Sequence, residues 1–348
     1  MLTERQMLIL RLIIQHYTES LEPIGSNTLI KVAGLPYSSA TIRNEMMRLE
    51  DLGFLEKYHT SSGRVPSNQG YRYYLDNILP LQPSHLPQQV REHIKAKFQN
   101  PTFEMQELFH LSADILATLT NYTSISLGPE LSSSHLTGFR LVRLNDQQLM
   151  VILVTDTGHV ENKVFSISKE VGDDELHQIV TVMNNELVGL PLPQVVQKLQ
   201  YELPNLIQKY FRSQLHVISA MNQILQKFEQ DRLHVSGKRN LLNYLDTHSN
   251  VSQLKDIYRL MDDSHVINQL VATQESGVKI RLGSEMNNPI LKDYSLITAS
   301  YETPSLEKGF IALLGPVNMP YSKVISIVNG LQTELSKTMF DYYKNRKE

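Results

Sequence analysis

The 348-residue sequence contains no cysteine and no tryptophan, and its apolar runs are short. The lack of cysteine excludes a disulfide framework, cysteine-based zinc sites and a cysteine nucleophile. The longest internal apolar runs, such as residues 149–154, have the length of a strand and cannot span a membrane. Glu4, Arg5 and Arg11 interrupt the apolar start, whose periodicity is helical, which argues against a signal peptide. We therefore expect a cytoplasmic protein.

Catalytic signatures are missing as well. The sequence has neither a Walker loop nor a GxGxxG motif, and its 12 histidines form no pair with the HxxxH spacing of a metal site. We expect no enzyme activity, no cofactor and no metal. The net charge of −3 excludes a general basic field, so any nucleic-acid binding must come from a local patch. The apolar share of 41% is typical of a globular protein, and the length favours two or three domains.

Residues 37–75 show the order of parts found in a recognition helix followed by a β-wing. Helical periodicity predicts helices over residues 3–20, 27–33 and 39–52, and Gly34 with Pro36 forms a tight turn between the last two. This is the helix-turn-helix pattern. Gly53 ends the third helix, and two short extended runs then flank the turn TSSG at residues 60–63. We expect a winged helix-turn-helix domain.

The third helix carries the candidate DNA contacts. Ile42, Met46 and Leu49 recur at helical spacing and face the core, which leaves the opposite face polar. Recognition helices read the major groove, where Arg pairs with guanine and Asn with adenine. The candidate residues are Ser38, Ser39, Thr41, Arg43, Asn44, Met47 and Arg48 in this helix and its cap, and His59, Thr60, Ser61, Ser62 and Arg64 in the wing. A solvated polar face on an ordinary helix has about equal weight on the pattern alone.

The first 80 residues are electrically neutral, with eight Lys and Arg against eight Asp and Glu. Because affinity for DNA depends on neutralising phosphates, one copy of this module should bind only modestly. The acids Glu19, Glu22, Glu50 and Asp51 must then lie away from the DNA face. We expect two copies to be needed.

The rest of the chain predicts an α+β architecture. Residues 136–168 alternate with a period of two and form a three-strand meander, and three more strands follow at 278–282, 294–301 and 309–314. An antiparallel sheet with helices on its faces is the layout of GAF-like and PAS-like sensor domains. The expected division is a DNA-binding domain at 1–80, a linker and connecting helix at 81–102, a GAF-like domain at 103–188 and 251–348, and a mostly helical dimerisation insertion at 189–250.

Within this insertion, apolar residues recur at intervals of three, four or seven over residues 205–229. Such a row either packs on its own domain or forms a seam with a second copy, and the pattern favours neither. The residues of the candidate seam are Ile207, Phe211, Ile218, Met221, Leu225 and Phe228.

Two segments resemble a known family. SSATIRNEMMRLEDLGFLEKYHTSSGRVPSNQGYRYYL at residues 38–75 and GFIALLGPVNMPYSKVI at residues 309–325 are similar to HrcA, the heat-inducible transcription repressors of bacteria. The resemblance implies a winged helix, a GAF-like domain and a dimerising insertion. It also implies repression of chaperone operons at an inverted-repeat operator, with the chaperonin as modulator.

The family's recognition motif falls on Ser39, Thr41, Ile42, Arg43 and Asn44, and its wing motif on Ser61, Ser62, Gly63 and Arg64. Two places depart from the family pattern: Ser67 stands where Thr is usual, and Val317-Asn318 where Thr-Arg is usual.

Two other functions fit the same sequence. One is a small-molecule-responsive winged-helix regulator with its ligand in the sheet domain. The other is a chaperone-associated adaptor that uses the winged helix for protein contacts only. An enzyme is the least supported class, because no catalytic constellation is present.

Overall fold

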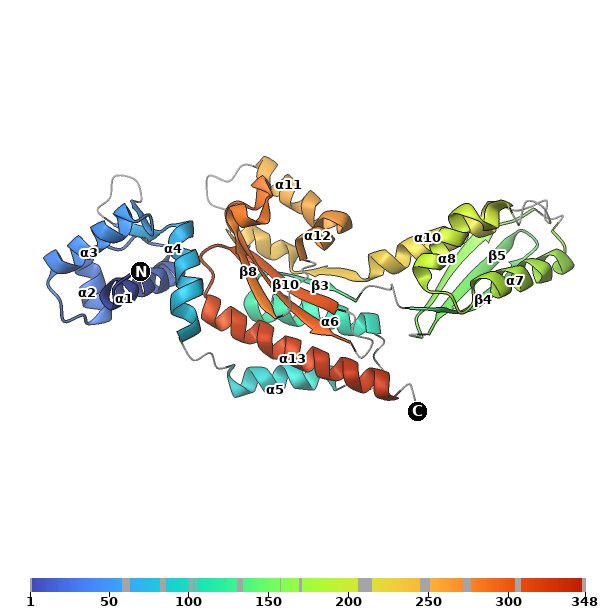
Figure 1. The fold of residues 1–348 in the computed structure, drawn as a ribbon, viewed down its shortest axis with the longest axis horizontal. Helices are drawn as coiled ribbons and strands as arrows, with labels where there is room; N and C mark the ends of the chain where they lie inside the picture. Colours follow the sequence, from blue (N-terminus) through green and yellow to red (C-terminus); the bar gives the residue numbers. More distant parts are fainter. Residues whose placement is uncertain are drawn as a thin grey trace. The chain divides into compact units, whose positions relative to one another are not determined.

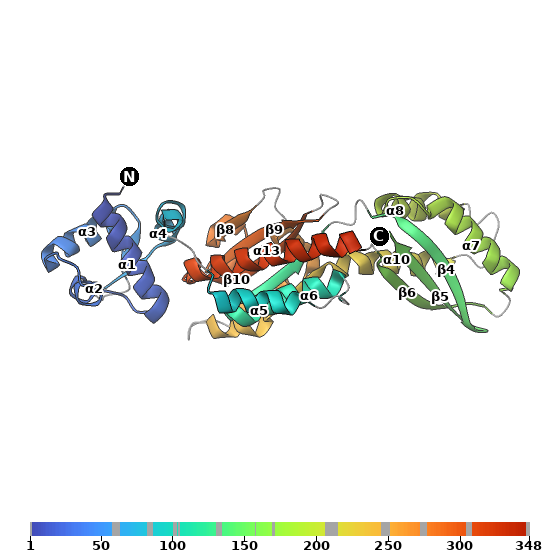
Figure 2. The same ribbon diagram turned by 90° about the horizontal axis from the view of Figure 1, so that it is seen from below.

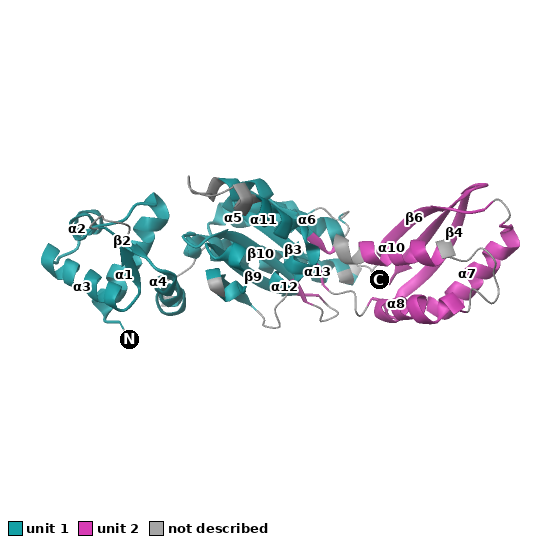
Figure 3. Cartoon of the chain, turned by 90° about the horizontal axis from the view of Figure 1, so that it is seen from above, with its two compact units in different colours: residues 1–127, 234–301, 310–348 teal, residues 128–233, 302–309 magenta. Residues whose placement is uncertain are grey.

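The computed structural model describes residues 2–57, 63–81, 86–99, 103, 105–129, 134–156, 158–168, 171–205, 215–244, 251–271, 277–303 and 308–345. The chain forms two compact units (Figure 3). Unit 1 consists of Met1–Leu127, His234–Tyr301 and Phe310–Glu348, and unit 2 of Gly128–Leu233 and Glu302–Gly309.

Unit 1 begins with three helices, as the periodicity predicts. They are α1 (Glu4–Ser20), α2 (Ser26–Ala33) and α3 (Ser39–Asp51). Thr3 and Gln6 form a capping box at the start of α1. Gly34 and Gly53 have φ angles of 61° and 79°, a left-handed conformation that only glycine adopts without strain, and they mark the ends of α2 and α3.

A two-stranded antiparallel ribbon follows α3. Its strands are β1 (Leu55–Lys57) and β2 (Arg64–Pro66), and after it come α4 (Asn68–Tyr73), the π-helical turn η1 (Tyr74–Ile78) and the short 3-10 turn η2 (Leu79–Leu81). Ser67 joins the two parts: its hydroxyl caps α4 by accepting from Gly70 N at 3.0 Å and donates to the carbonyl of Gly53 at 2.5 Å. The family's usual threonine would offer the same hydroxyl.

Glu50 fastens the ribbon to α3. Its carboxylate accepts from Arg64 Nε at 2.7 Å and lies 2.6 Å from Arg64 NH2 and 3.1 Å from Lys57 Nζ. Burial by itself raises the pKa of Glu50, but hydrogen bonds and charges from Lys57 and Arg64 outweigh it and hold the pKa below its usual value. The charged carboxylate therefore stabilises the folded ribbon.

The centre of unit 1 is a five-stranded sheet with the order β7-β3-β10-β9-β8. Its strands are β3 (Thr123–Leu127), β7 (Leu233–Ser236), β8 (Val278–Leu282), β9 (Tyr294–Glu302) and β10 (Lys308–Pro316). The helices around it are α5 (Gln88–Phe98), α6 (Met105–Thr120), α11 (Val251–Asp262), α12 (Ser264–Val271) and α13 (Tyr321–Asn345). Strand β9 is buried along almost its whole length, as in the middle of a covered sheet. Figures 1 and 2 show α5, α6 and α13 together along one side of the sheet.

Unit 2 has its own sheet and its own core. The sheet is an antiparallel meander with the order β4-β5-β6, made of β4 (Leu136–Asn145), β5 (Gln148–Thr155) and β6 (Val160–Ser166). The helices are α7 (Asp173–Leu187), α8 (Leu192–Tyr201) and α10 (Leu215–Asp231). Phe139, Val151 and Leu153 of the sheet pack against Met183 of α7 and Val195 of α8.

Two predictions about the sheet domain are therefore wrong. The meander at 136–168 does not share a sheet with the later strands, and the second unit begins at residue 128 and ends its main segment at 233, in place of 189–250. Alternation with a period of two predicts that a strand has one buried face. It cannot tell which helices or strands cover that face, and this is where the prediction failed.

The contribution of Glu50 to stability should depend on pH. Its folded pKa lies below the unfolded value of about 4.3, so the stabilisation is complete above that pH and is lost as the pH falls through the folded pKa. We expect Glu50→Gln to lower the free energy of unfolding by about 2 kcal/mol at pH 7, because Arg64 loses a charged hydrogen-bond partner. Urea unfolding of both proteins between pH 7 and pH 3 measures the free energy of unfolding. The difference between Glu50→Gln and the wild type should become smaller as the pH falls.

The control is Glu56→Gln, which removes an exposed acid from β1 and should change stability little at any pH. A Glu50→Gln effect of constant size down to pH 3 would show that the charge of Glu50 is not what stabilises the ribbon.

Candidate nucleic-acid interface

Helix α3 presents one exposed polar row. Ile42, Met46 and Leu49 are buried in the core of the three helices, as predicted. The exposed row consists of Arg43, Asn44, Met47 and Arg48, with Ser39 and Thr41 half-buried beside it. The structure thus brings the helical candidates together on one face, where the guanidinium groups of Arg43 and Arg48 and the carboxamide of Asn44 are exposed to solvent.

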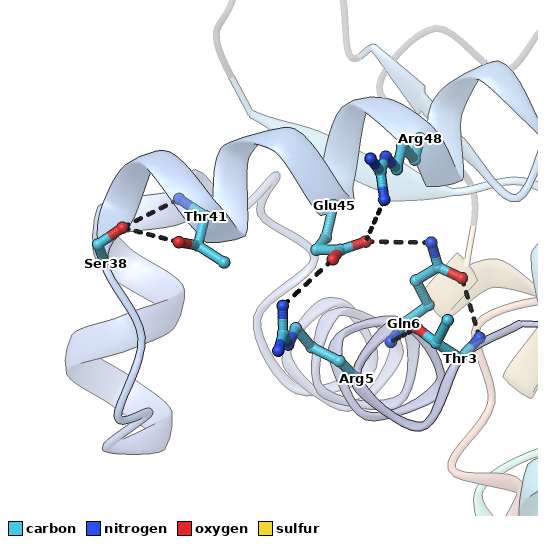
Figure 4. Close-up of polar contacts among 7 residues, drawn as sticks. All are labelled: Thr3, Arg5, Gln6, Ser38, Thr41, Glu45 and Arg48. Carbon is cyan, nitrogen blue, oxygen red and sulfur yellow. Dashed lines mark hydrogen bonds and ion pairs between the residues drawn. The ribbon is translucent and has the colours of Figure 1, made fainter.

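The start of α3 is capped by Ser38. Its hydroxyl accepts from Thr41 N at 3.1 Å and lies 2.8 Å from the Thr41 hydroxyl (Figure 4). The Ser39 hydroxyl lies 3.1 Å from that of Ser26 on α2. These contacts hold the first turn of α3 against α2, and the positive end of the helix dipole opens beside the exposed row.

Glu45 is the residue of α3 that sequence reasoning missed. Its side chain is only 11% exposed, and it is surrounded by Gln6, Arg5 and Arg48 (Figure 4). Position 45 follows Ile42 by three residues and precedes Leu49 by four, which is the spacing of the buried face. The spacing therefore predicts a buried position, but an acidic residue is not expected at one.

The ribbon contributes less than expected among the residues that can be placed. Arg64 is 12% exposed in its side chain and its guanidinium pairs with Glu50, whereas Lys57 is 60% exposed. A contact between Arg64 and DNA stays a prediction, and the ion pair competes with it. His59, Thr60, Ser61 and Ser62 lie outside the described residues.

The described residues of the candidate dimer seam lie in the core of unit 2. Ile218, Met221 and Leu225 of α10 are 8%, 0% and 7% exposed, and they belong to the core that α10 shares with α7, α8 and the sheet. Ile207 and Phe211 lie outside the described residues, as does the side chain of Phe228. The three placed side chains are covered by their own chain, and a partner could meet unit 2 only on a surface that does not include them.

The sheet of unit 2 offers such a surface. Val142 faces Met150 across β4 and β5, and Met150 faces Val164 across β5 and β6, so the three share one face. Val154 and Val160 form the next row but one on this face. Val142, Val160 and Val164 are 42%, 53% and 40% exposed. An apolar row of this kind on an open sheet commonly marks an interaction surface.

Other site types find little support in the part of the chain that can be described. There, no three His, Asp or Glu side chains gather closely enough to hold a metal ion. Within the same residues, no helix combines the length and the apolar character that crossing a membrane requires.

Comparisons with known proteins identify the family of this chain. Residues 106–325 match the family described as HrcA protein C terminal domain. The chain is 42% identical over 347 residues to the heat-inducible transcription repressor HrcA of Enterococcus faecalis, and 43% identical over 345 residues to that of Tetragenococcus halophilus. Each alignment covers 99% of this chain and 99% of the relative.

The fold also has a solved counterpart. A crystal structure titled only as a hypothetical protein matches with a TM-score of 0.66 and 21% identity, over 98% of this chain and 100% of that one. At that identity the likeness concerns the fold alone. The family match and the full-length relatives carry the assignment: the chain belongs to the HrcA family.

Proposed function

We propose that this chain is a heat-inducible transcription repressor that binds an inverted-repeat operator as a homodimer and controls chaperone operons. The relatives named heat-inducible transcription repressor support the class, which is not an enzyme class. The observation that carries the mechanism is the exposed row of α3, with Arg43 and Asn44 side by side above a core-facing row.

We further propose that the first 80 residues form a winged helix-turn-helix. The three helices, the turn at Gly34 and the antiparallel ribbon after α3 support this reading. In such a domain the third helix enters the major groove and its N-terminal residues contact base edges. Arg43 would donate to guanine and Asn44 would pair with adenine, while the start of α3 lies at a phosphate. The five-stranded sheet would be the GAF-like domain.

The homodimer follows from charge and symmetry. A module with eight cations and eight anions neutralises few phosphates, so one copy would bind weakly. An inverted repeat has two-fold symmetry, which matches a protein dimer with the same symmetry. A two-fold contact uses the same surface on both copies, so it must complement itself. The row Val142, Met150 and Val164 is apolar and meets this condition. We place the second copy there, since the α10 row is already covered.

The chaperonin is proposed as the modulator because of the family resemblance. It would change the amount of active repressor without altering the base contacts. Footprints of genomic fragments with and without chaperonin would test this, and they would also identify the operator fragment.

A second candidate is a regulator that responds to a small molecule. A cavity of about 530 Å³ lies among α1, η1, α5 and α13, within the size range of ligand sites. Ile14, Tyr74 and Val90 line its apolar part, and Lys323 and Ser326 its polar part. A metabolite that shifts the melting temperature and changes affinity for DNA would favour this candidate.

Removing the base-reading side chains should abolish specificity. We expect Arg43→Ala and Asn44→Ala each to reduce the preference for the operator over random DNA by about tenfold or more, because each pair discriminates by roughly 1–3 kcal/mol. Fluorescence anisotropy at fixed salt measures both affinities. The matched control is Arg91→Ala, which removes an exposed arginine from α5 and should leave the preference unchanged.

Full specificity in both variants would refute the assignment of α3. If the wild-type chain bound no inverted repeat in a gel shift, the adaptor function would gain support instead.

Charging the uncovered sheet face should separate the copies. In Val142→Glu combined with Val164→Glu, each copy would bring two carboxylates to an apolar contact, and burying them unpaired is costly. We expect sedimentation to change from dimer to monomer and the operator affinity to fall. Val188→Glu is the control, because Val188 is a 37% exposed valine at the end of α7. A dimer that survives the double substitution would place the interface elsewhere.

A further inference from the structure

The environment of Glu45 is unusual for a small helical core. One carboxylate oxygen lies 3.5 Å from Arg5 NH1. The other accepts from Gln6 Nε2 at 3.0 Å and lies 4.0 Å from Arg48 NH1 (Figure 4). One acid on α3 thus holds two residues from the first turn of α1 and one from its own helix.

Both arginines remain accessible while they are held. Arg5 is 44% exposed and Arg48 is 70% exposed in their side chains. The guanidinium of Arg5 also lies 4.8 Å from the centre of the Tyr37 ring, a cation–π contact. Tyr37 directly precedes Ser38, the cap of α3. Arg5 is therefore held from two sides beside the start of α3.

Gln6 extends this arrangement to the start of α1. Its side-chain oxygen accepts from Thr3 N at 3.0 Å in the capping box, while its nitrogen donates to Glu45. Gln6 is 7% exposed. The carboxamide orientation is fixed by these two bonds, so the helix cap of α1 aligns the acid of α3.

Stability alone does not account for an acid at this position. Removing a carboxylate from water is costly, and apolar residues of similar size often replace buried ion pairs without loss of stability. A shared carboxylate does something that an apolar side chain cannot do. It lets two like charges on different helices contact the same group while both remain exposed to solvent.

We propose that Glu45 is a positioning residue of the DNA interface and that Arg5, outside the recognition helix, contacts a backbone phosphate there. This inference rests on the proposed function. In helix-turn-helix proteins the contacts to phosphates fix the register of the recognition helix on the duplex. Arg5 and Arg48 would supply two such contacts with the N–H groups that do not face Glu45. Base reading by Arg43 and Asn44 then depends on the register that Glu45 maintains.

Glu45→Gln keeps the size of the side chain and removes one negative charge near DNA. The change can act in two ways, through general electrostatic attraction or through the register of the helix on the duplex, and the two predict different affinities. Electrostatics alone would raise the affinity for all duplexes. Loss of register would instead lower the affinity for the operator and leave the affinity for unrelated DNA equal or higher.

The test uses the full-length chain and two labelled duplexes, the operator fragment found by footprinting and a scrambled duplex of equal length and composition. Anisotropy gives both affinities between about 50 and about 200 mM salt. We expect Glu45→Gln to reduce the operator-to-scrambled ratio about tenfold, the effect of one lost discriminating contact. We expect Arg5→Gln to lower the salt slope by about 1 for each copy, with scrambled DNA weakened equally.

The matched control is Asp51→Asn, which removes an exposed acid from the end of the same helix and should leave the ratio unchanged. Combining Glu45→Gln with Arg5→Gln should cost less than the sum of the two, because the acid acts partly through Arg5.

Three results would overturn the proposal. Glu45→Gln could lower the affinity for both duplexes equally together with the melting temperature, or it could raise the affinity for both duplexes equally. Arg5→Gln could leave the salt slope unchanged, and this measurement does not depend on whether Glu45→Gln folds well. A wild-type chain without any preference for the operator would refute the proposed function itself, whereas a wild-type preference that survives Glu45→Gln refutes only the role of Glu45.

Discussion

Two partly buried carboxylates, Glu45 and Glu50, hold helix α3 in place, and the candidate interface depends on them. Glu45 ties the helix to the first turn of α1, and Glu50 ties it to the ribbon through Arg64. Both acids lie on the sides of α3 that face its neighbours, so the outer row keeps its arginines and its asparagine. The acids Glu45 and Glu50 are thus directed away from the exposed row, which carries Arg43 and Arg48 although the first 80 residues contain equal numbers of acids and bases.

The local features of this domain could be predicted because neighbouring residues determine them. The capping box at Thr3, the stop at Gly53 and the buried row of Ile42, Met46 and Leu49 all follow from spacing within one helix or turn. The partners of Glu45 could not be predicted in the same way. Arg5 and Gln6 lie some 40 residues earlier in the chain, and only the packing of α1 on α3 brings them to the acid.

The same limit explains the errors beyond the first domain. The alternation in residues 136–168 correctly indicates strands, yet the covering layer comes from α7, α8 and α10, which follow later in the chain. The apolar row of α10 was compatible with a core or a seam, and its placed members Ile218, Met221 and Leu225 lie in the core. A periodic row shows that a helix face is buried without showing what buries it. The apolar residues on the outer face of this sheet are harder to recognise in the sequence. Val142 and Val164 lie at outward positions, between the inward residues of the same strands, where a half-buried strand usually has polar residues.

The position of unit 2 in the chain is compatible with the proposed role in association, because an added contact there need not disturb the sheet of unit 1. Its main segment leaves after β3 and returns before β7, and these two strands are neighbours in the sheet. Gly128 N donates to the Arg232 carbonyl at 2.7 Å, and Arg232 Nε donates back to the Gly128 carbonyl at 3.3 Å, so the two ends of the segment are joined to one another. An insertion between adjacent ends costs the host sheet little. If two copies join through this unit, as proposed, the second DNA contact becomes an intramolecular event, whose gain in affinity depends on effective concentration and needs no further contacts. For the proposed neutral DNA-binding module, that gain would turn weak contact with one half-site into stable occupation of both.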